Sequence, residues 1–198
     1  NFPSFYNLFY KKKYSFSTGS VAEGIAVNKI GKINSKILNE YVDKCVLVKE
    51  KKIEEAISLF LMKDKTLVEG AGAIGLAAIL EGKIPKTSRH IGLIACGGNL
   101  DSRVLSSLLM RELVRKKKIL TLSIDMDDKP GQLNQIATLC NQEKINILEV
   151  EHSRFTLDLS VRAARLNITL ETRNEEHAYT IIRKIKNLGF KVEEKKKN

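Results

Sequence analysis

The 198-residue chain is 43% hydrophobic and 29% charged, and its 34 lysines and arginines against 23 acidic residues give a net charge of +11. These are values of a globular protein, and no run approaches the roughly 20 apolar residues that span a membrane, so we expect no membrane partner. The lysines lie in short runs between predicted elements with few aromatics among them. The basic charge therefore indicates solvated surface, and we expect no nucleic acid as partner.

Three cysteines, Cys45, Cys96 and Cys140, are widely separated, odd in number and outside any Cys-x-x-Cys pattern. This spacing predicts neither a disulfide framework nor a zinc site. Cysteines that stay unpaired are typical of a reducing compartment, so we expect a cytoplasmic protein.

In the first part of the chain, hydrophobic periodicity predicts helices over 4–10, 36–43, 51–62 and 67–80, and a short strand over 44–48. The helix over 67–80 is small and apolar all round, which predicts burial against a sheet or a ligand. Glu69, at its start, is favoured by the helix dipole. The residue is therefore either a helix cap or a functional group.

The stretch from Ile91 to Cys96 is apolar on both faces, which predicts a buried strand of an α/β sheet. Gly97 and Gly98 then allow a sharp turn and a close approach of the backbone to a ligand. Asp101 and Ser102 are predicted to cap a helix over 103–115. Ligands of open α/β sheets bind at the carboxyl ends of strands, so Cys96 is a candidate site residue. The alternative is a glycine turn beside a small buried thiol.

The second part of the chain has a different pattern. It predicts a strand over 119–126, a helix over 133–140, strands over 145–155 and 161–172, a helix over 174–188 and a last strand from Phe190. The order β-α-β-β-α-β is the split βαβ arrangement. We therefore expect two domains, 1–116 and 117–198.

Four segments, taken together and in this order, resemble the threonine dehydratase (threonine ammonia-lyase) family. Residues 20–27, Ser-Val-Ala-Glu-Gly-Ile-Ala-Val, are similar to the family's Thr-x-Ala-Asp-Gly-x-Ala-Val segment. Residues 68–73 read Val-Glu-Gly-Ala-Gly-Ala, like the start of a family helix. Residues 96–99, Cys-Gly-Gly-Asn, resemble the Ser/Cys-Gly-Gly-Asn turn beside pyridoxal 5'-phosphate (PLP). Residues 128–131 and 146–152 are similar to the ACT domain that many of these enzymes carry.

The resemblance implies an α/β protein: the C-terminal part of a fold-type II PLP-enzyme open sheet, followed by a ferredoxin-like ACT domain. It implies PLP-dependent β-elimination of ammonia from L-threonine, giving 2-oxobutanoate, with L-serine as the other possible substrate. A thiol at position 96 would make only a weak hydrogen bond to the ring nitrogen, which we expect to favour β-elimination. The cofactor-binding residues implied are Cys96, Gly97, Gly98, Asn99, Glu69 and Gly24.

Glu23 occupies a position where many relatives have an aspartate, which in some of them helps to hold a cation. A companion acidic residue is missing, and hard cations favour several oxygen ligands, so Glu23 is only a weak candidate and we expect no metal.

The sequence departs from the family at one important point. It contains neither the Ser-Phe-Lys-x-Arg segment with the Schiff-base lysine nor a run of three or four glycines for the cofactor phosphate. The resemblance therefore implies the C-terminal part of a dehydratase, without a catalytic residue of its own and inactive alone. The other readings are a non-catalytic amino-acid-binding regulatory module and a relative of serine dehydratase or serine racemase.

The ACT resemblance implies regulation. Such domains generally pair side by side and bind a small amino acid at the interface, so we expect a homo-oligomer with an amino-acid effector. Backbone N–H groups at a helix start would receive the effector's carboxylate. The effector-binding residues implied are Lys129, Gly131, Asn146 and Ile147. The alternative is a turn and a strand that serve only dimer packing.

Overall fold

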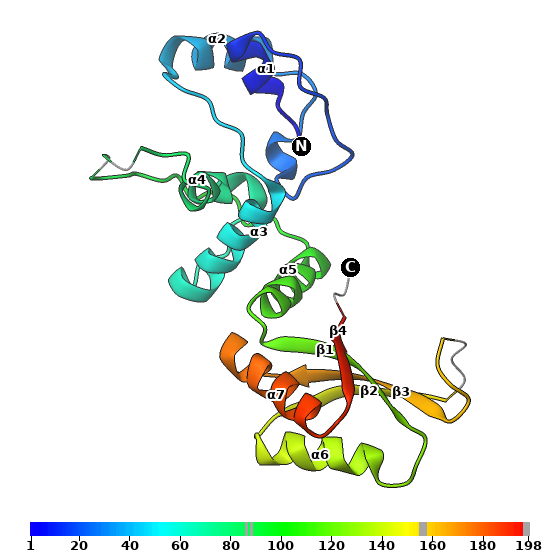
Figure 1. Cartoon of the computed structure of the whole chain (residues 1–198). Coiled ribbons are helices and arrows are strands. Elements are labelled where there is room, and N and C mark those ends of the chain that lie inside the picture. The colour runs from blue at the N-terminus through cyan, green and yellow to red at the C-terminus, as the bar shows by residue number, and fades with distance from the viewer. Residues whose placement is uncertain (86, 88, 155–157, 196–198) are drawn as a thin grey trace. The chain divides into compact units, whose positions relative to one another are not determined.

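A computed structural model describes residues 1–85, 87, 89–154 and 158–195 (Figure 1). The chain folds into two compact units, Asn1–Leu109 and Met110–Asn198, whereas we predicted a division at 116/117. Each unit is described by itself below. No helix among the described residues is long and apolar enough to cross a membrane.

The first unit is built from helices. The predicted helices over 4–10, 51–62, 67–80 and 103–115 are confirmed, and the helix predicted from Lys36 begins earlier, at Lys32. A 3-10 turn, η1, and a π turn, η2, which extends α3, complete the unit. The elements are α1 (Ser4–Tyr10), η1 (Glu23–Ile25), α2 (Lys32–Tyr41), α3 (Glu50–Leu59), η2 (Phe60–Asp64), α4 (Gly70–Leu80) and the start of α5 (Ser102–Arg115).

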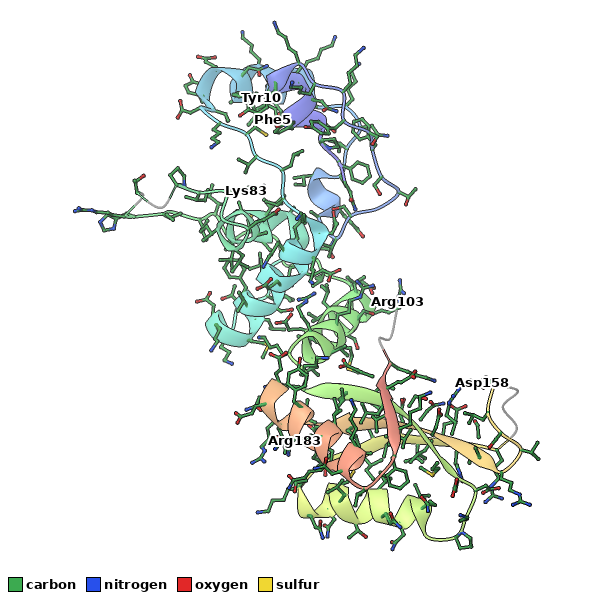
Figure 2. The ribbon with its side chains drawn as sticks, in the orientation of Figure 1. Phe5, Tyr10, Lys83, Arg103, Asp158 and Arg183 are labelled. Atoms are coloured by element: carbon green, nitrogen blue, oxygen red, sulfur yellow. The ribbon has the colours of Figure 1, made fainter. Side chains whose placement is uncertain are left out.

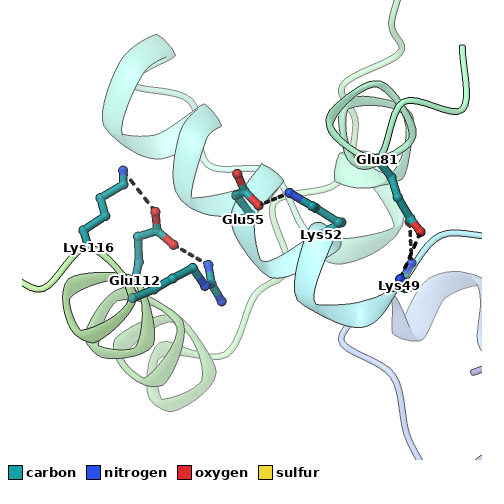
Figure 3. Close-up of polar contacts among 7 residues, drawn as sticks. Lys49, Lys52, Glu55, Glu81, Glu112 and Lys116 are labelled. Atoms are coloured by element: carbon teal, nitrogen blue, oxygen red, sulfur yellow. Dashed lines mark hydrogen bonds and ion pairs between the residues drawn. The ribbon is translucent and has the colours of Figure 1, made fainter. Parts of the chain in front are cut away.

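The core of this unit lies between α3 and α4. Ile53 and Ile57 of α3 are buried with Ala73 and Ala77 of α4, because the small side chains of α4 allow a neighbouring helix to approach closely. The ends of the two helices are joined by a polar contact, in which the backbone N–H of Lys49 donates to the carboxylate of Glu81 at 2.9 Å (Figure 3). The side chains of α1, among them Phe5 and Tyr10, are drawn in Figure 2.

The strands predicted over 44–48 and 91–96 are wrong. Both segments are irregular, and residues 91–96 are exposed, with Ile94 at 85%. A strand exists only where a neighbouring strand pairs with its N–H and C=O groups. The described part of this unit contains no strand, so neither segment has a partner. The hydrophobic pattern of both segments is typical of a strand, but the backbone hydrogen bonds to a neighbouring strand that would form one are missing.

The second unit confirms the predicted β-α-β-β-α-β order. Each predicted element is present with small shifts at its ends, and Phe155, the last residue of the predicted second strand, lies outside the described residues. The elements are β1 (Ile119–Asp127), α6 (Gln132–Gln142), β2 (Asn146–Ser153), β3 (Ala163–Glu171), α7 (Glu175–Asn187) and β4 (Lys191–Glu194).

These strands form one antiparallel sheet in the order β2-β3-β1-β4. The core residues of β1 and β3, such as Leu122 and Leu166, alternate with polar ones and are buried together with Ile136 of α6 and Ile181 of α7. Both helices therefore cover the same face of the sheet, as Figure 1 shows. The strand β2 lies at an edge, is largely exposed, and has an irregular register between Ile147 and Glu149.

The other face of the sheet carries an ion-pair network centred on Arg165. Its guanidinium contacts Asp125 of β1 at 2.7 Å and Asp158, which precedes β3 and is labelled in Figure 2, at 2.6 Å. The hydrogen bond from Arg165 lowers the pKa of Asp158 below its ordinary value. The network ties Asp158 to the sheet.

Candidate functional site

The three segments that resemble the catalytic part of the family meet at the N-terminal end of α4. The first of them, residues 20–27, packs on the helix start at Gly70. A Cβ at this glycine would lie 2.7 Å from the backbone nitrogen of Ala22 and closer still to the carbonyl oxygen of Val21. The contact is backbone against backbone, so only glycine fits here.

The third segment, residues 96–99, packs on the next glycine of the helix, Gly72. A Cβ at this position would lie 2.9 Å from the carbonyl carbon of Cys96 and would overlap its oxygen. In the Val-Glu-Gly-Ala-Gly-Ala sequence, Gly70 and Gly72 therefore leave the helix backbone uncovered at two positions. The backbone of residues 20–27 packs on the first, and the backbone of residues 96–99 packs on the second.

Glu69 lies between these two segments. Its backbone N–H donates to the carbonyl oxygen of Gly97 at 2.9 Å, and Gly97 has a positive φ of 74°. A Cβ at Gly24 would lie 3.4 Å from the Glu69 carboxylate oxygen Oε1. Glu69 occupies the N-cap position of α4 but makes no side-chain cap hydrogen bond. Glu69 thus stands at the helix start, as both readings expect, and its carboxylate lies near Gly24 and Gly97.

Cys96 is an exposed free thiol at this junction, whereas Cys140 is buried in the other unit. Burial raises the pKa of Cys140 to about 11 and also raises the pKa of the half-buried Cys45. The alternative reading of Cys96 as a small buried thiol is wrong.

The turn that follows Cys96 leads directly into α5. Gly98 approaches the chain at Leu67, where its Cβ would lie 4.0 Å from the carbonyl oxygen. Asn99 is exposed. The predicted cap at Asp101 is confirmed, because its Oδ1 accepts from the backbone N–H of Arg103 at 2.9 Å and of Val104 at 3.2 Å. The cap fixes where the helix begins after the turn.

Sequence reasoning missed Glu50, which holds the 20–27 segment in place. Its carboxylate accepts from the Ser20 hydroxyl at 2.6 Å and from the Val21 backbone N–H at 3.0 Å. The partners are about thirty positions apart in the chain, so no local pattern could have indicated the pair.

A cavity of about 460 Å³ has Gly24 in its wall. Its wall includes Phe5 and Tyr6 of α1, Ile25 of η1 and Ile53 of α3. The volume suits a small organic molecule. Because its wall is built from segments far apart in the chain, no local sequence pattern indicated it.

The described residues contain no group of three or more His, Cys, Asp or Glu side chains that could hold a metal ion. Glu23, the weak metal candidate, is exposed at the start of η1.

The four residues implied for effector binding do not meet within one chain. Lys129 and Gly131 follow the end of β1, where Asp127 pairs with Ala163 of β3. Asn146 and Ile147 begin β2, where Asn146 pairs with Glu171 at the opposite end of β3. At about 3.3 Å per residue, the two ends of β3 are roughly 25 Å apart. A single amino acid cannot bridge them.

Each pair has a defined local geometry. Lys129 forms an ion pair with Asp127 at 2.8 Å, which raises the pKa of Lys129 and lowers that of Asp127. Gly131 takes the N-cap position of α6 with a φ of 89° and no side-chain cap. At the other end, the Asn146 amide donates to the carboxylate of Glu171 at 2.9 Å, and Ile147 is 37% exposed.

Comparison with known proteins agrees with the resemblance found in the sequence. Residues 116–189 match the ACT domain family. The chain is 37% identical over 176 residues to an L-threonine ammonia-lyase of Geobacter sulfurreducens, covering 89% of this chain and 44% of that protein. It is 31% identical over 173 residues to an L-threonine ammonia-lyase of Thermotoga maritima, covering 87% and 43%. The chain thus spans less than half the length of both relatives.

Among solved structures, a threonine deaminase of T.th. is similar at 30% identity, with 48% of this chain and 35% of that one covered and a TM-score of 0.42.

Proposed function

We infer that this chain, a member of the L-threonine ammonia-lyase family with an ACT domain at residues 116–189, forms one wall of a PLP site and the regulatory domain of a threonine ammonia-lyase. The observation that carries the proposal is the meeting of the three catalytic-type segments at the start of α4. Glu69 and Gly72 of the second segment contact Gly97 and Cys96 of the third, and Gly70 contacts the first.

The residues at this junction fit the cofactor. Because Gly97 has no side chain, the Glu69 carboxyl group packs directly against the turn after Cys96, and a Cβ at Gly24 would lie 3.4 Å from the same carboxylate. The carboxylate is thus held beside the exposed backbone of two glycines, which no side chain of their own shields from a flat ring. Cys96 is exposed beside them with its backbone anchored on Gly72. The groups proposed to contact the cofactor are Cys96, Gly97, Gly98, Asn99, Glu69 and Gly24.

When bound, PLP supplies an electron sink for the carbanion left by loss of the substrate's α-proton. The proposed role of this chain is to position the cofactor and to set the charge at its ring nitrogen. The Cys96 thiol would make only a weak hydrogen bond to the ring nitrogen and would add no charge there. A nitrogen without a carboxylate partner is expected to favour loss of the β-hydroxyl of L-threonine, or of L-serine, over reactions that need a long-lived carbanion.

The chain by itself is proposed to be inactive, because its sequence has no Ser-Phe-Lys-x-Arg segment to attach the cofactor and move the α-proton. The three free cysteines support a cytoplasmic location.

The ACT domain is proposed to bind a small amino acid between two copies. Its two half-sites lie at opposite ends of the sheet. Antiparallel pairing of the exposed β2 edges would bring Asn146 and Ile147 of one copy to the end that carries Lys129 and Gly131 of the other. Pairing of two copies would therefore bring together the two half-sites, which lie apart within one chain.

The test joins the full chain to the part of the Geobacter sulfurreducens relative that it does not match. We expect the fusion to bind PLP and form 2-oxobutanoate from L-threonine, and the chain alone to form none. In the fusion, Cys96→Asp should change the absorption of bound PLP and raise transamination relative to elimination, whereas Cys45→Ala should change neither. An active fusion whose PLP spectrum and product ratio are the same with Asp at position 96 would contradict the proposed site. Heat stabilisation of a fusion by isoleucine, valine or serine, without turnover, would favour the non-catalytic module.

A further inference from the structure

The helix α2 carries a row of apolar side chains that is open to solvent. Ile33, Ile37 and Tyr41 follow one another at a spacing of four residues, so they lie on one side of the helix. Their exposed fractions are 76%, 50% and 73%, and no residue of α2, all of which the structure describes, is buried. Single exposed apolar residues are common, but a contiguous row of three indicates a contact surface. We call this row the α2 stripe.

A different side of α2 faces its own unit. Asn34 and Leu38 line the cavity of about 460 Å³, together with Phe5 and Tyr6 of α1. On a helix with 3.6 residues per turn, these two positions are rotated away from the α2 stripe. The stripe is therefore not the side by which α2 packs on the rest of the N-terminal unit.

Two opposite charges border the α2 stripe on the same side. Lys36 lies three residues after Ile33 and one before Ile37. Glu40 lies one helical turn further along, one residue before Tyr41. Neither of the two forms an ion pair in the described part of the chain. A lysine that precedes a glutamate by four residues is the less favourable order for pairing within a helix. Both charges are therefore available to a partner.

We propose that α2 pairs with α2 of a second copy of this chain, with the two helices antiparallel and the α2 stripes in contact. The observation that carries the proposal is the order of the two bordering charges. A two-fold axis between antiparallel helices brings the N-terminal half of each against the C-terminal half of the other. Lys36 of each copy then faces Glu40 of the other, and this contact occurs twice. The surface is separate from the β2 edge and goes beyond the proposed function.

Other arrangements satisfy fewer of these groups. In a parallel pair, Lys36 would face Lys36 and Glu40 would face Glu40, and like charges in an interface repel. The part of the relatives that this chain does not match is another candidate occupant, since the matched region covers 44% and 43% of their lengths. Two-fold antiparallel pairing is the arrangement that covers the apolar row and pairs both charges with groups present in this chain.

The size of the surface sets the expected strength of the pairing. The ten residues of α2 make a helix about 15 Å long. This is less than the roughly 800 Å² per partner of a standard interface can occupy. We therefore expect a reversible association, with a Kd in the range of roughly 10 to 1,000 μM, which is measured over a series of concentrations.

The experiment measures the molar mass of the full chain by analytical ultracentrifugation over this range of concentrations. Lys36→Glu places like charges at both contacts and should weaken the association at least about tenfold. The exchanged variant, Lys36→Glu with Glu40→Lys, restores opposite charges at both contacts and should associate like the wild-type chain. Whether or not the β2 edges also pair, loss of the α2 contact should halve the molar mass at high concentration.

Two further variants serve as matched controls. Lys13→Glu makes the same change of charge at an exposed position outside α2 and should leave the association unchanged. Ile37→Lys removes the centre of the α2 stripe and should weaken the association at least about 100-fold. Because Ile37 is half exposed, this variant should unfold in urea at the wild-type midpoint when both are dilute. Far-UV circular dichroism reports that each variant is folded.

Equal molar masses for Lys36→Glu and the wild-type chain at every concentration would overturn the proposal. A loss of association that the exchanged variant does not restore would also overturn it, because only antiparallel self-pairing regains both contacts. The fusion with the unmatched part of the Geobacter sulfurreducens relative gives the third readout. There, Ile37→Lys should again lower the molar mass. An unchanged mass with a lower Tm would assign the α2 stripe to the ammonia-lyase part and overturn pairing with a second copy.

Discussion

Glu69 and Gly97 are in contact through both backbone and side chain. The Glu69 N–H donates to the Gly97 carbonyl at 2.9 Å, and the Glu69 side chain fills the space in which a Cβ at position 97 would lie. The contact joins the start of α4 to the turn that follows Cys96. It explains physically why only glycine fits at position 97.

Gly97→Ala should destabilise the N-terminal unit by about 2 kcal/mol, because its φ of 74° is unfavourable for alanine and the new Cβ would displace Glu69. Urea unfolding followed by tyrosine fluorescence measures this change, since four of the five tyrosines lie in that unit: Tyr6, Tyr10, Tyr14 and Tyr41. Gly31→Ala, where no atom lies within 4 Å, is the control. Equal midpoints for the two variants would show that the Glu69–Gly97 contact is absent.

Gly72→Ala and Gly75→Ala should have opposite effects although both replace a glycine of α4. Alanine favours the helix by up to about 1 kcal/mol. At position 75 the new Cβ meets only the end of the Leu93 side chain, at 3.1 Å, so this variant should be neutral or more stable. At position 72 it meets the Cys96 backbone, which must move away. We expect a loss of about 2 kcal/mol in urea unfolding, and a stable Gly72→Ala protein would exclude that packing.

Asp101→Ala should destabilise α5 by about 1 kcal/mol, the usual cost of losing an N-cap side chain. The Asp101 carboxylate accepts two backbone N–H groups of the first turn. Asp101→Asn keeps an acceptor oxygen and should retain most of the stability. Amide exchange at Arg103 and Val104 measures the effect locally. If alanine and asparagine behave alike, the cap contributes nothing.

The cysteines should differ strongly in alkylation by iodoacetamide at pH 8. Cys96 is exposed and should react first. Cys140 is buried, and its pKa of about 11 leaves roughly one thiolate in a thousand at this pH. Peptide mass spectrometry over time measures the order, and unfolding in urea should make the three rates similar. Reaction of Cys140 before Cys96 in the folded chain would contradict the burial of the first and the exposure of the second.

The contact between Glu143 and Lys184 predicts a pH-dependent contribution to the stability of the C-terminal unit. The hydrogen bond from Lys184 lowers the pKa of Glu143 below its ordinary value of 4.5. A carboxylate with a lowered pKa stabilises the fold above the ordinary value and loses this effect as the pH falls through the lowered one. Lys184→Met should therefore reduce the Tm at pH 7 but leave it nearly unchanged at pH 2.5. A reduction of the same size at both pH values would exclude the linkage.

Lys186→Met, a neighbouring lysine on α7, is the control for the loss of charge alone. It should change the Tm less at pH 7 and show no comparable dependence on pH.

The C-terminal unit could be predicted from the sequence almost element by element, because its strands find their partners within about eighty residues of chain. Alternation along Ile119–Asp127 and helical spacing along Glu175–Asn187 match the structure. The strand over 91–96 could not be predicted correctly in the same way. The hydrophobic pattern indicates which side chains a segment would bury. Whether the segment becomes a strand also depends on a neighbouring strand, which the local sequence does not reveal.

The residues of the candidate cofactor site stay a prediction from the motifs, and the motifs did not indicate how these residues pack together. The motifs named Glu69, Cys96 and Gly97, and the structure places them at one junction. The packing roles of Gly70 and Gly72, and the Glu50 contact to Ser20, depend on contacts far apart in sequence. The residues that the resemblance implies for effector binding show the opposite case, in which the structure separates residues that the sequence grouped. Lys129 and Asn146 were grouped by resemblance, yet the register of β3 separates them.

The irregular register of β2 has a consequence for solubility. The step from Ile147 to Glu149 leaves Leu148 without a partner on β3, so the spacing of amide groups along the outer edge changes there. Only a few consecutive N–H and C=O groups of this edge match the spacing of those on an arbitrary extended peptide. The carboxylates of Glu149 and Glu151 also repel acidic peptides. Apart from the proposed pairing with a second copy, the edge thus offers no regular template on which fibres would grow.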